Sequence, residues 1–209
     1  MSTPLITTKN LKFSQSNKIL INNAEFSIHK FDRIILVGTN GCGKSSLLRI
    51  LKGIDVPDQG KIWIAPNIKI DLLEQNPQMP KTNNLTDFIS KGNQHPNLSR
   101  VSLILEQLGL TDVDLTKQLS GGEIRKIYLA QSILNEPDIM LLDEPTNHID
   151  LPTIDWLEKK LLELNTTMII VSHDQEFLKR IGTRTFWFNR TELIQREGPY
   201  DDFFEWTEQ

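Results

Sequence analysis

The 209-residue sequence has few of the features that mark secreted or membrane-spanning proteins. Its one cysteine, Cys42, excludes an intrachain disulfide framework and fits a reducing compartment. The longest apolar runs, such as IILV and MIIV, are far shorter than the ~18 residues that a membrane helix needs. The first residues contain neither the basic nor the apolar region of a signal peptide. We therefore expect a cytoplasmic chain.

The chain also has no strong excess of one charge. Its 23 basic and 27 acidic side chains give a net charge of −4, so no global field draws it onto nucleic acid or an anionic membrane. The 38% hydrophobic and 24% charged composition is that of an ordinary globular protein. No internal repeat or low-complexity segment occurs, and the length predicts one domain over residues 1–209.

Short apolar runs alternate with helical patterns along most of the chain. The expected strands are Ala24–Ile28, Arg33–Val37, Lys61–Ile64, Ile68–Leu73, Ile139–Leu142 and Met168–Val171. The expected helices are Ser45–Leu51, Val101–Leu108, Gly122–Leu134, Thr153–Leu164 and Gln175–Ile181. This alternation predicts an α/β fold with a largely parallel sheet. Residues 76–134 are expected to form a short inserted helical lobe, and residues 185–209 a final hairpin and a docked tail.

The segment GTNGCGKSS follows an apolar strand directly and precedes a helix. Its glycines let successive N–H groups point at phosphate oxygens, beside a helix N-terminus whose dipole favours negative charge. Lys44 adds a charge for the terminal phosphates, and Ser45 adds a hydroxyl ligand for Mg²⁺. Cys42 is either a small residue that fits the loop or a thiol made reactive by its neighbours. The predicted nucleotide-binding residues are Gly38, Thr39, Asn40, Gly41, Cys42, Gly43, Lys44, Ser45 and Ser46.

Two adjacent carboxylates, Asp143 and Glu144, end the apolar run IMLL. Ligands of open α/β sheets bind at the carboxyl ends of the strands, so this pair is expected near the phosphate loop. Asp143 would reach the Mg²⁺ region, while Glu144 would polarise an attacking water. One metal-binding and one water-orienting carboxylate are a sufficient hydrolytic set for phosphoryl transfer.

Three further features lie at strand ends or helix starts. His173 follows the run MIIVS and is expected either to contact the γ-phosphate or the attacking water, or to be structural. Gln75 ends DLLEQ and is a similar strand-end group for metal or water. LSGGE, Leu119 to Glu123, precedes a helix and is either a second anion site or a plain helix cap.

In their order along the chain, these motifs resemble those of the ATP-binding cassette (ABC) ATPases. GTNGCGKS resembles Walker A, LLEQ the Q-loop, LSGGE the signature, IMLLDE Walker B, NHID the D-loop and VSHD the switch histidine. The resemblance implies a P-loop NTPase fold, with an ABC-type mostly parallel sheet, an antiparallel β subdomain and a short helical lobe. It implies ATP and Mg²⁺ as cofactors. The site residues that it implies are Ser45, Gln75 and Asp143 for magnesium and Lys44, Glu144 and His173 for catalysis.

The resemblance also implies a composite site. In this family the signature contacts the γ-phosphate that a second cassette holds, so Ser120, Gly121, Gly122 and Glu123 would act in trans. Asp150 would lie at the seam between the cassettes. Phe13 would stack on adenine, with packing inside a strand as the alternative. Because each motif occurs once, two copies, or this chain with a related cassette, would enclose two ATP molecules.

EPTNHID is similar to the motif usual in the ABC-F family, soluble ATPases that bind the ribosome, and TIDWLE, VSHDQEFL and GPYDDF are similar to its Uup-type members. A dimerising ATPase that acts on the ribosome or another ribonucleoprotein is the first hypothesis. The ATP-binding subunit of a membrane transporter, with a separate membrane-spanning partner, is the second. A nucleotide-gated binding module with negligible turnover is the third, and Lys44, Glu144 and His173 argue against it.

Overall fold

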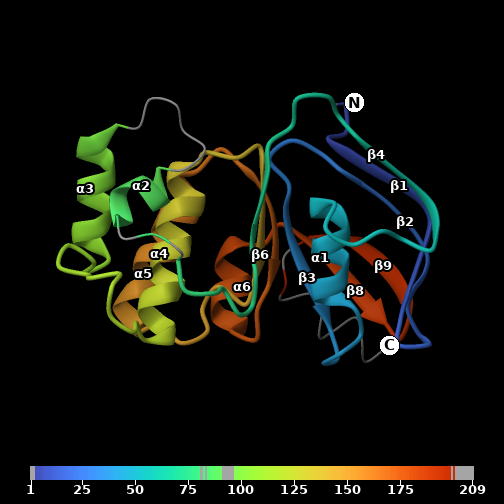
Figure 1. The fold of residues 1–209 in the computed structure, drawn as a ribbon. Helices are drawn as coiled ribbons and strands as arrows, with labels where there is room; N and C mark the ends of the chain where they lie inside the picture. Colours follow the sequence, from blue (N-terminus) through green and yellow to red (C-terminus); the bar gives the residue numbers. More distant parts are fainter. Residues whose placement is uncertain (1–2, 81, 83, 91–96, 199, 201–209) are drawn as a thin grey trace.

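The computed structural model describes residues 3–80, 82, 84–90, 97–198 and 200. These residues form strands and helices that alternate through most of the chain (Figure 1). The strands are β1 (Ile6–Gln15), β2 (Lys18–Ile28), β3 (Arg33–Gly38), β4 (Gln59–Ile64), β5 (Ile70–Leu73), β6 (Ile139–Asp143), β7 (Thr167–Val171), β8 (Arg184–Asn189) and β9 (Glu192–Glu197). The helices are α1 (Lys44–Lys52), α2 (Leu85–Ile89), α3 (Leu98–Gln107), α4 (Gly121–Leu134), α5 (Leu151–Glu163) and α6 (Gln175–Ile181).

The central sheet has the strand order β5-β6-β7-β3-β8-β9. All its neighbouring strands pair in parallel except β8 and β9, which form an antiparallel hairpin. Because β3, β6 and β7 run the same way, their carboxyl ends meet at one edge of the sheet, where Asp143 pairs with Val171. The loop after Gly38 leaves from the same edge.

Two hydrophobic layers cover the faces of this sheet. Successive side chains of a strand point to opposite faces, and β3 shows the alternation clearly. Ile35 and Val37 pack in a cluster with α2 to α6, while Ile34 and Leu36 pack in a second cluster with α1 and the strands β1 and β2. Figure 1 shows α2, α3 and α4 at one end of the molecule and the small sheet at the other. The central sheet therefore lies between two layers and presents its loop-bearing edge to the solvent.

The second sheet is antiparallel, with the order β2-β1-β4. The sequence patterns did not predict β1, and they placed the start of β2 at Ala24 instead of Lys18. The reason is a break in the period-two pattern. Thr8 and Leu11 are buried on either side of Asn10, which has a φ of 50°, and the register with β2 shifts between them. A bulge of this kind moves the apolar side chains out of phase.

The remaining expected elements correspond to helices and strands of the structure, with ends that differ by a few residues. The patterns missed α2, a short helix capped by Asn84 within a stretch rich in Pro, Asn and Thr. Of the predicted docked tail, Tyr200 is buried against the α-helical layer, and residues 201–209 lie outside the described residues.

The predicted fold class, a mostly parallel α/β sheet with an antiparallel β part and a few helices, is confirmed. No helix in the described ranges is long and apolar enough to cross a bilayer.

Candidate active site

The loop between β3 and α1 has the backbone that its glycines predict. Gly43 is the N-cap of α1 with a φ of 111°, in the left-handed region that glycine adopts without a steric cost. A Cβ at Gly43 would lie 3.1 Å from Cβ of Leu20, so the position is also crowded. The backbone N–H of Cys42 donates to the carbonyl of Thr39 (3.3 Å) and closes a turn within the loop. The loop thus brings a run of backbone N–H groups to the start of a helix.

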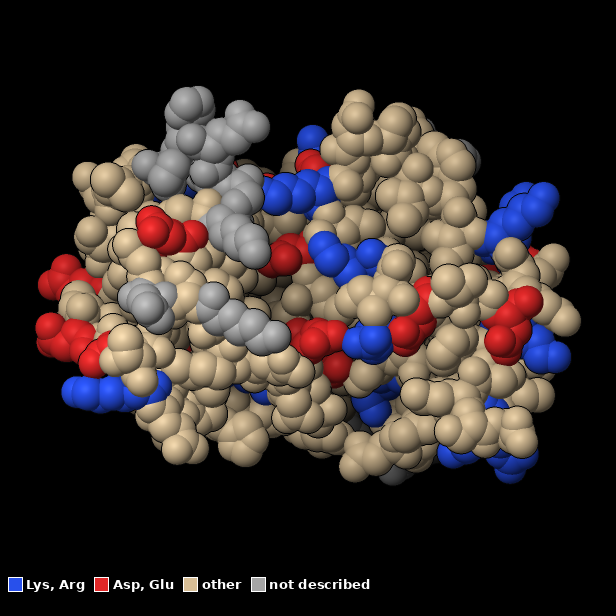
Figure 2. Space-filling model, viewed as in Figure 1, with Lys and Arg blue, Asp and Glu red and all other residues tan. Residues whose placement is uncertain are grey.

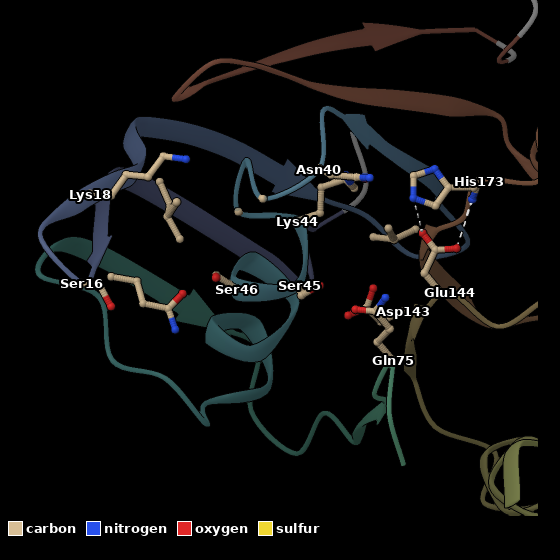
Figure 3. A pocket seen from close by; sticks show the side chains of 15 residues that line it. Ser16, Lys18, Asn40, Lys44, Ser45, Ser46, Gln75, Asp143, Glu144 and His173 are labelled. Atoms are coloured by element: carbon tan, nitrogen blue, oxygen red, sulfur yellow. Dashed lines mark hydrogen bonds and ion pairs between the residues drawn. The ribbon is translucent and has the colours of Figure 1, made fainter. Parts of the chain in front are cut away.

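A cavity of about 620 Å³ opens over this loop (Figure 3). The described residues that line it come from three places. The loop and helix α1 contribute Asn40, Gly41, Gly43, Lys44, Ser45 and Ser46, and other strand ends contribute Gln75, Asp143, Glu144, Val171 and His173. The β1–β2 hairpin contributes Gln15, Ser16, Lys18 and Leu20. A smaller cavity of about 340 Å³ shares Lys44 and His173 with it and is bordered by Gly38 and Thr39. Segments far apart in the sequence therefore meet around one cavity.

The Lys44 ammonium lies inside the loop. Its Nζ donates to the carbonyls of Gly38 (2.8 Å) and Thr39 (3.1 Å). These bonds hold a positive charge beside the helix N-terminus and the exposed N–H groups of the loop. The arrangement suits an anion, because the charge, the helix dipole and the N–H donors would all favour phosphate.

Cys42 lies in the core beneath the loop and does not line the larger cavity. Burial raises the pKa of its thiol, and the opposing effect of the Lys44 charge is smaller. A Cβ on Gly38 would lie 2.8 Å from the Cys42 sulfur, so the thiol packs closely against the loop backbone. The structure supports a small packing residue and does not support the reactive thiol.

The two carboxylates of β6 are buried, with 5% of Asp143 and 3% of Glu144 exposed. Burial raises the pKa of both groups. A hydrogen bond from Ser45 and the charges of Lys44 and Arg125 oppose this rise at Asp143. The Ser45 hydroxyl and the Asp143 carboxylate therefore lie together, as a shared cation would require.

Glu144 adopts a left-handed backbone with a φ of 54°, which is uncommon outside glycine. Its N–H donates to the carbonyl of Val171 (2.8 Å), and its carbonyl accepts from Asn147 (3.2 Å). The turn places the carboxylate against the end of β7, where the His173 N–H donates to Oε2 (3.1 Å) and His173 Nε2 lies 3.4 Å from Oε1 (Figure 3). The histidine side chain is 63% exposed at the cavity, so it is free to meet a ligand.

Sequence reasoning missed Arg125, a guanidinium that is only 2% exposed. It donates to the carbonyls of Glu74 (3.2 Å), Asp143 (3.3 Å) and Gln75. Burial lowers its pKa, and the charges of Asp143 and Glu144 oppose this shift. Arg125 thus joins helix α4 to two strand ends of the site. The sequence did contain one signal for this role, a basic residue among the apolar residues of a predicted helix.

The signature residues lie at the start of α4. Ser120 and Glu123 form a reciprocal capping box, with the Glu123 N–H donating to Ser120 Oγ (3.2 Å) and the Ser120 N–H to Glu123 Oε2 (2.8 Å). A Cβ on Gly122 would lie 2.6 Å from the His148 carbonyl oxygen, whereas one on Gly121 would meet nothing within 4 Å. None of residues 120–123 is among the described residues that line the cavity. The segment is a helix cap in this chain, and Gly121 leaves open space in front of it.

Asp150 begins helix α5 as its N-cap, accepting from the Thr153 N–H (2.9 Å). Its other carboxylate oxygen accepts from Lys126 Nζ of α4 (2.9 Å), and these bonds hold its pKa well below the usual range. Asp150 therefore links the signature helix to the loop that follows the carboxylate pair.

The structure does not support the predicted stacking of Phe13 on adenine. Phe13 is 9% exposed and packs in the core cluster beneath the small sheet, and it is not among the described residues that line the cavity. Gln15, Ser16, Lys18 and Leu20 lie at that end of the cavity instead. Sequence reasoning missed them because β1 and its hairpin had not been predicted.

The buried charge of Glu144 predicts a pH-dependent stability. Because its folded pKa is raised, stability is highest below the ordinary carboxyl pKa and falls as pH rises through the raised value. Glu144→Gln removes the buried charge and keeps an oxygen for the His173 N–H. Near pH 7 we expect a Tm higher by about 2–4 °C, the shift that roughly 1 kcal/mol gives in a chain of this size. Thermal melts from pH 4 to pH 8 should show the gain shrinking toward low pH; a constant gain would contradict this account.

Comparisons with known proteins identify the family of this chain. A family model described as "ABC transporter" matches residues 21–147. The chain is 37% identical to the ATP-binding protein Uup of Buchnera aphidicola subsp. Acyrthosiphon pisum, over 96% of this chain and 35% of that protein. Against the Escherichia coli Uup protein it is 32% identical over 95% of this chain and 38% of the relative. It therefore spans little more than a third of these relatives.

A shorter relative and a solved structure match more of their own length. The chain is 33% identical to the zinc import ATP-binding protein ZnuC of Rickettsia conorii, over 83% of this chain and 78% of that protein. A solved structure of the ATP binding subunit of an ABC transporter matches with a TM-score of 0.83 at 18% identity, over 98% of this chain and 93% of that one. The predicted likeness to ABC-F proteins of the Uup type is confirmed by sequence, and the fold by structure. The chain belongs to the ABC transporter family of ATP-binding cassettes, which hydrolyse ATP.

Proposed function

We propose that this cassette hydrolyses MgATP in a composite site that two cassettes form together. The observation that carries the proposal is the cavity itself, where the phosphate loop, Asp143, Glu144 and His173 meet at one edge of the sheet. The signature residues begin a helix outside that cavity, which fits a role toward a second cassette. Steady-state phosphate release with and without Mg²⁺ tests the hydrolysis directly.

The donors at the phosphate end fit magnesium. Ser45 offers a hydroxyl, Asp143 a carboxylate and Gln75 an amide oxygen, all hard oxygen ligands of the kind Mg²⁺ takes alongside phosphate and water. Bound Mg²⁺ would neutralise charge on the phosphates. Lys44 and the loop N–H groups would hold the β- and γ-phosphates in place. Phosphoryl transfer depends mainly on positioning and charge neutralisation, and these residues would supply both.

Glu144 is the group that would orient the attacking water. Its carboxylate is fixed by the His173 N–H and by the turn after β6, so it is held before substrate arrives. The exposed His173 imidazole would contact the γ-phosphate or that water. As a carboxylate must be ionised to polarise water, turnover should fall as pH drops through the raised pKa of Glu144.

Alanine substitutions at the adjacent glycines 121 and 122 test whether a second cassette completes the site. Gly122→Ala should lower the Tm by several degrees, because the new methyl overlaps the His148 carbonyl at a cost of about 1–3 kcal/mol. Gly121→Ala meets nothing within this chain and should leave the Tm unchanged or slightly higher. If Gly121 faces a second nucleotide, its alanine variant should nevertheless lose at least tenfold in turnover, while a nucleotide titration shows unchanged binding to the monomer. Full turnover in Gly121→Ala would argue against the composite site.

The proposed target of the cassette is the ribosome or another ribonucleoprotein in the cytoplasm. The basis is the likeness to Uup-type ABC-F proteins. On the face drawn in Figure 2, basic and acidic side chains are interspersed, so binding to RNA would depend on local contacts and not on a single-sign field. An alternative is the ATP-binding subunit of a transporter with a separate membrane-spanning partner, which the match to ZnuC favours. Sedimenting Glu144→Gln protein with MgATP and either ribosomes or membranes distinguishes them by the fraction that carries the protein.

A further inference from the structure

The cavity has two ends of different construction. Figure 3 shows Asp143, Glu144 and His173 at one end and Ser16 and Lys18 at the other, with the phosphate loop between them. A nucleotide whose phosphates lie on the loop and reach the carboxylates must extend its sugar and base toward the β1–β2 hairpin. That hairpin end is where the identity of the base would be read.

No phenylalanine, tyrosine or tryptophan is among the described residues that line the cavity. Phe13 is turned into the core, and the residues that follow it reach the cavity instead: Gln15 and Ser16 at the end of β1 and Lys18 and Leu20 in β2. Gln15 pairs with Lys18 across a tight turn in which Ser16 and Asn17 have φ of 49° and 64°. The hairpin therefore presents flexible polar side chains and one aliphatic side chain where a ring would have stacked.

We propose that this site selects the magnesium triphosphate and accepts purine and pyrimidine bases alike, with Gln15 and Lys18 beside the base in place of an aromatic platform. The inference rests on the proposed nucleotide hydrolysis and adds the substrate class, nucleoside triphosphates in general.

Two physical arguments support weak base selection. Strong discrimination between similar ligands requires buried polar groups that the wrong ligand leaves unpaired, but Gln15, Ser16 and Lys18 are exposed and water can replace a missing partner. The Gln15 amide also carries both donors and acceptors, so a rotation of the group matches either the amino edge of adenine or the carbonyl edge of guanine. One such exposed hydrogen bond changes affinity by a factor of about five.

Because no aromatic side chain among the described lining residues is available to stack on the base, the affinity would come mainly from contacts with the phosphates. Stacking a base on an aromatic side chain strengthens binding by roughly five- to hundredfold, and this site lacks that contribution within its described residues. The loop N–H groups and Lys44 contact phosphate, which every nucleoside triphosphate shares. Magnesium tripolyphosphate should therefore compete with ATP at a concentration within about tenfold of that of unlabelled ATP.

The test measures phosphate release from ATP, GTP, CTP and UTP with Mg²⁺ and the full chain. We expect kcat/KM values within about tenfold of one another. A preference larger than tenfold for any one base would overturn the inference while leaving the proposed function intact. If the protein neither binds nor hydrolyses ATP, GTP, CTP or UTP, the proposed function itself is wrong.

Two variants test whether the nucleotide base lies beside residue 15. Gln15→Trp supplies a ring at the hairpin end and should lower KM for ATP and GTP about fivefold or more, with a smaller effect for UTP, because purines stack over a larger area. An unchanged KM for all four nucleotides would show that residue 15 does not lie beside the base. Phe13→Leu is the matched control: it should lower the Tm by several degrees through lost core packing and leave the relative use of the four nucleotides unchanged.

Discussion

Glu144→Gln is expected to reduce ATP turnover by about three orders of magnitude while ATP binding changes by less than a few fold. The carboxylate is buried at the cavity and held by the His173 N–H, and in the proposed mechanism it orients the attacking water. A positioned base contributes typically 10²–10⁴-fold. The amide keeps the shape and the hydrogen bond but cannot accept a proton from water. Single-turnover phosphate release, with binding followed by a fluorescent ATP analogue, separates the two effects.

A matched control lies on helix α6, which follows β7. Glu176→Gln removes an exposed carboxylate that forms an ion pair with Lys179, so turnover should stay within twofold of the original. Retention of more than a tenth of the turnover in Glu144→Gln, with the control unaffected, would assign the water-orienting role to another group.

Lys44→Ala is expected to weaken MgATP binding by at least a hundredfold. The ammonium is a positive charge held within the loop by the carbonyls of Gly38 and Thr39. Its loss leaves these carbonyls without their donor and, in the proposed site, removes the cation that faces the phosphates. Charge-assisted bonds to phosphate are about twice as strong as neutral ones, so one Lys that meets two phosphates accounts for a loss of this size. Isothermal titration with MgATP measures it.

The control for this change is Lys52→Ala at the far end of helix α1. Lys52 donates to the carbonyl of Ile70 outside the cavity, so its loss should leave nucleotide affinity unchanged. Lys44→Arg provides a second measurement, because it keeps the charge but replaces the compact ammonium with a planar fork. Near-normal affinity in Lys44→Ala would contradict the proposed phosphate site.

Much of the site followed from local sequence rules because its parts are local. A glycine-rich turn before a helix, and polar residues directly after apolar strands, depend on neighbours in sequence and on the shared edge of a parallel sheet. Asp143, Glu144 and His173 were predicted at one edge from their positions at the ends of β6 and β7. The structure brings Glu144 and His173 within hydrogen-bonding distance and pairs Asp143 with Val171 on the neighbouring strand. The strand order that makes them neighbours was the only long-range assumption.

What the sequence did not reveal depends on packing between distant segments. The bulge near Asn10 hid β1, and without that strand the direction of Phe13 could not be judged. The reach of Arg125 to the carbonyls of Glu74 and Gln75 required the relative position of α4 and β5. Lys18 lies before the strand that was predicted from Ala24, and only the observed hairpin places it at the cavity. In each case the pattern along the chain was consistent with several three-dimensional arrangements.

The composite site is the central claim, and the mass of the Glu144→Gln protein in saturating MgATP tests it most directly. Since hydrolysis is blocked in this variant, closed pairs of cassettes should accumulate. Analytical ultracentrifugation should give a species of twice the 24.0 kDa chain that retains two ATP molecules, and removal of Mg²⁺ or the further change Gly121→Ala should return it to the monomer. A monomer that binds one ATP at saturation and never doubles in mass would contradict the account.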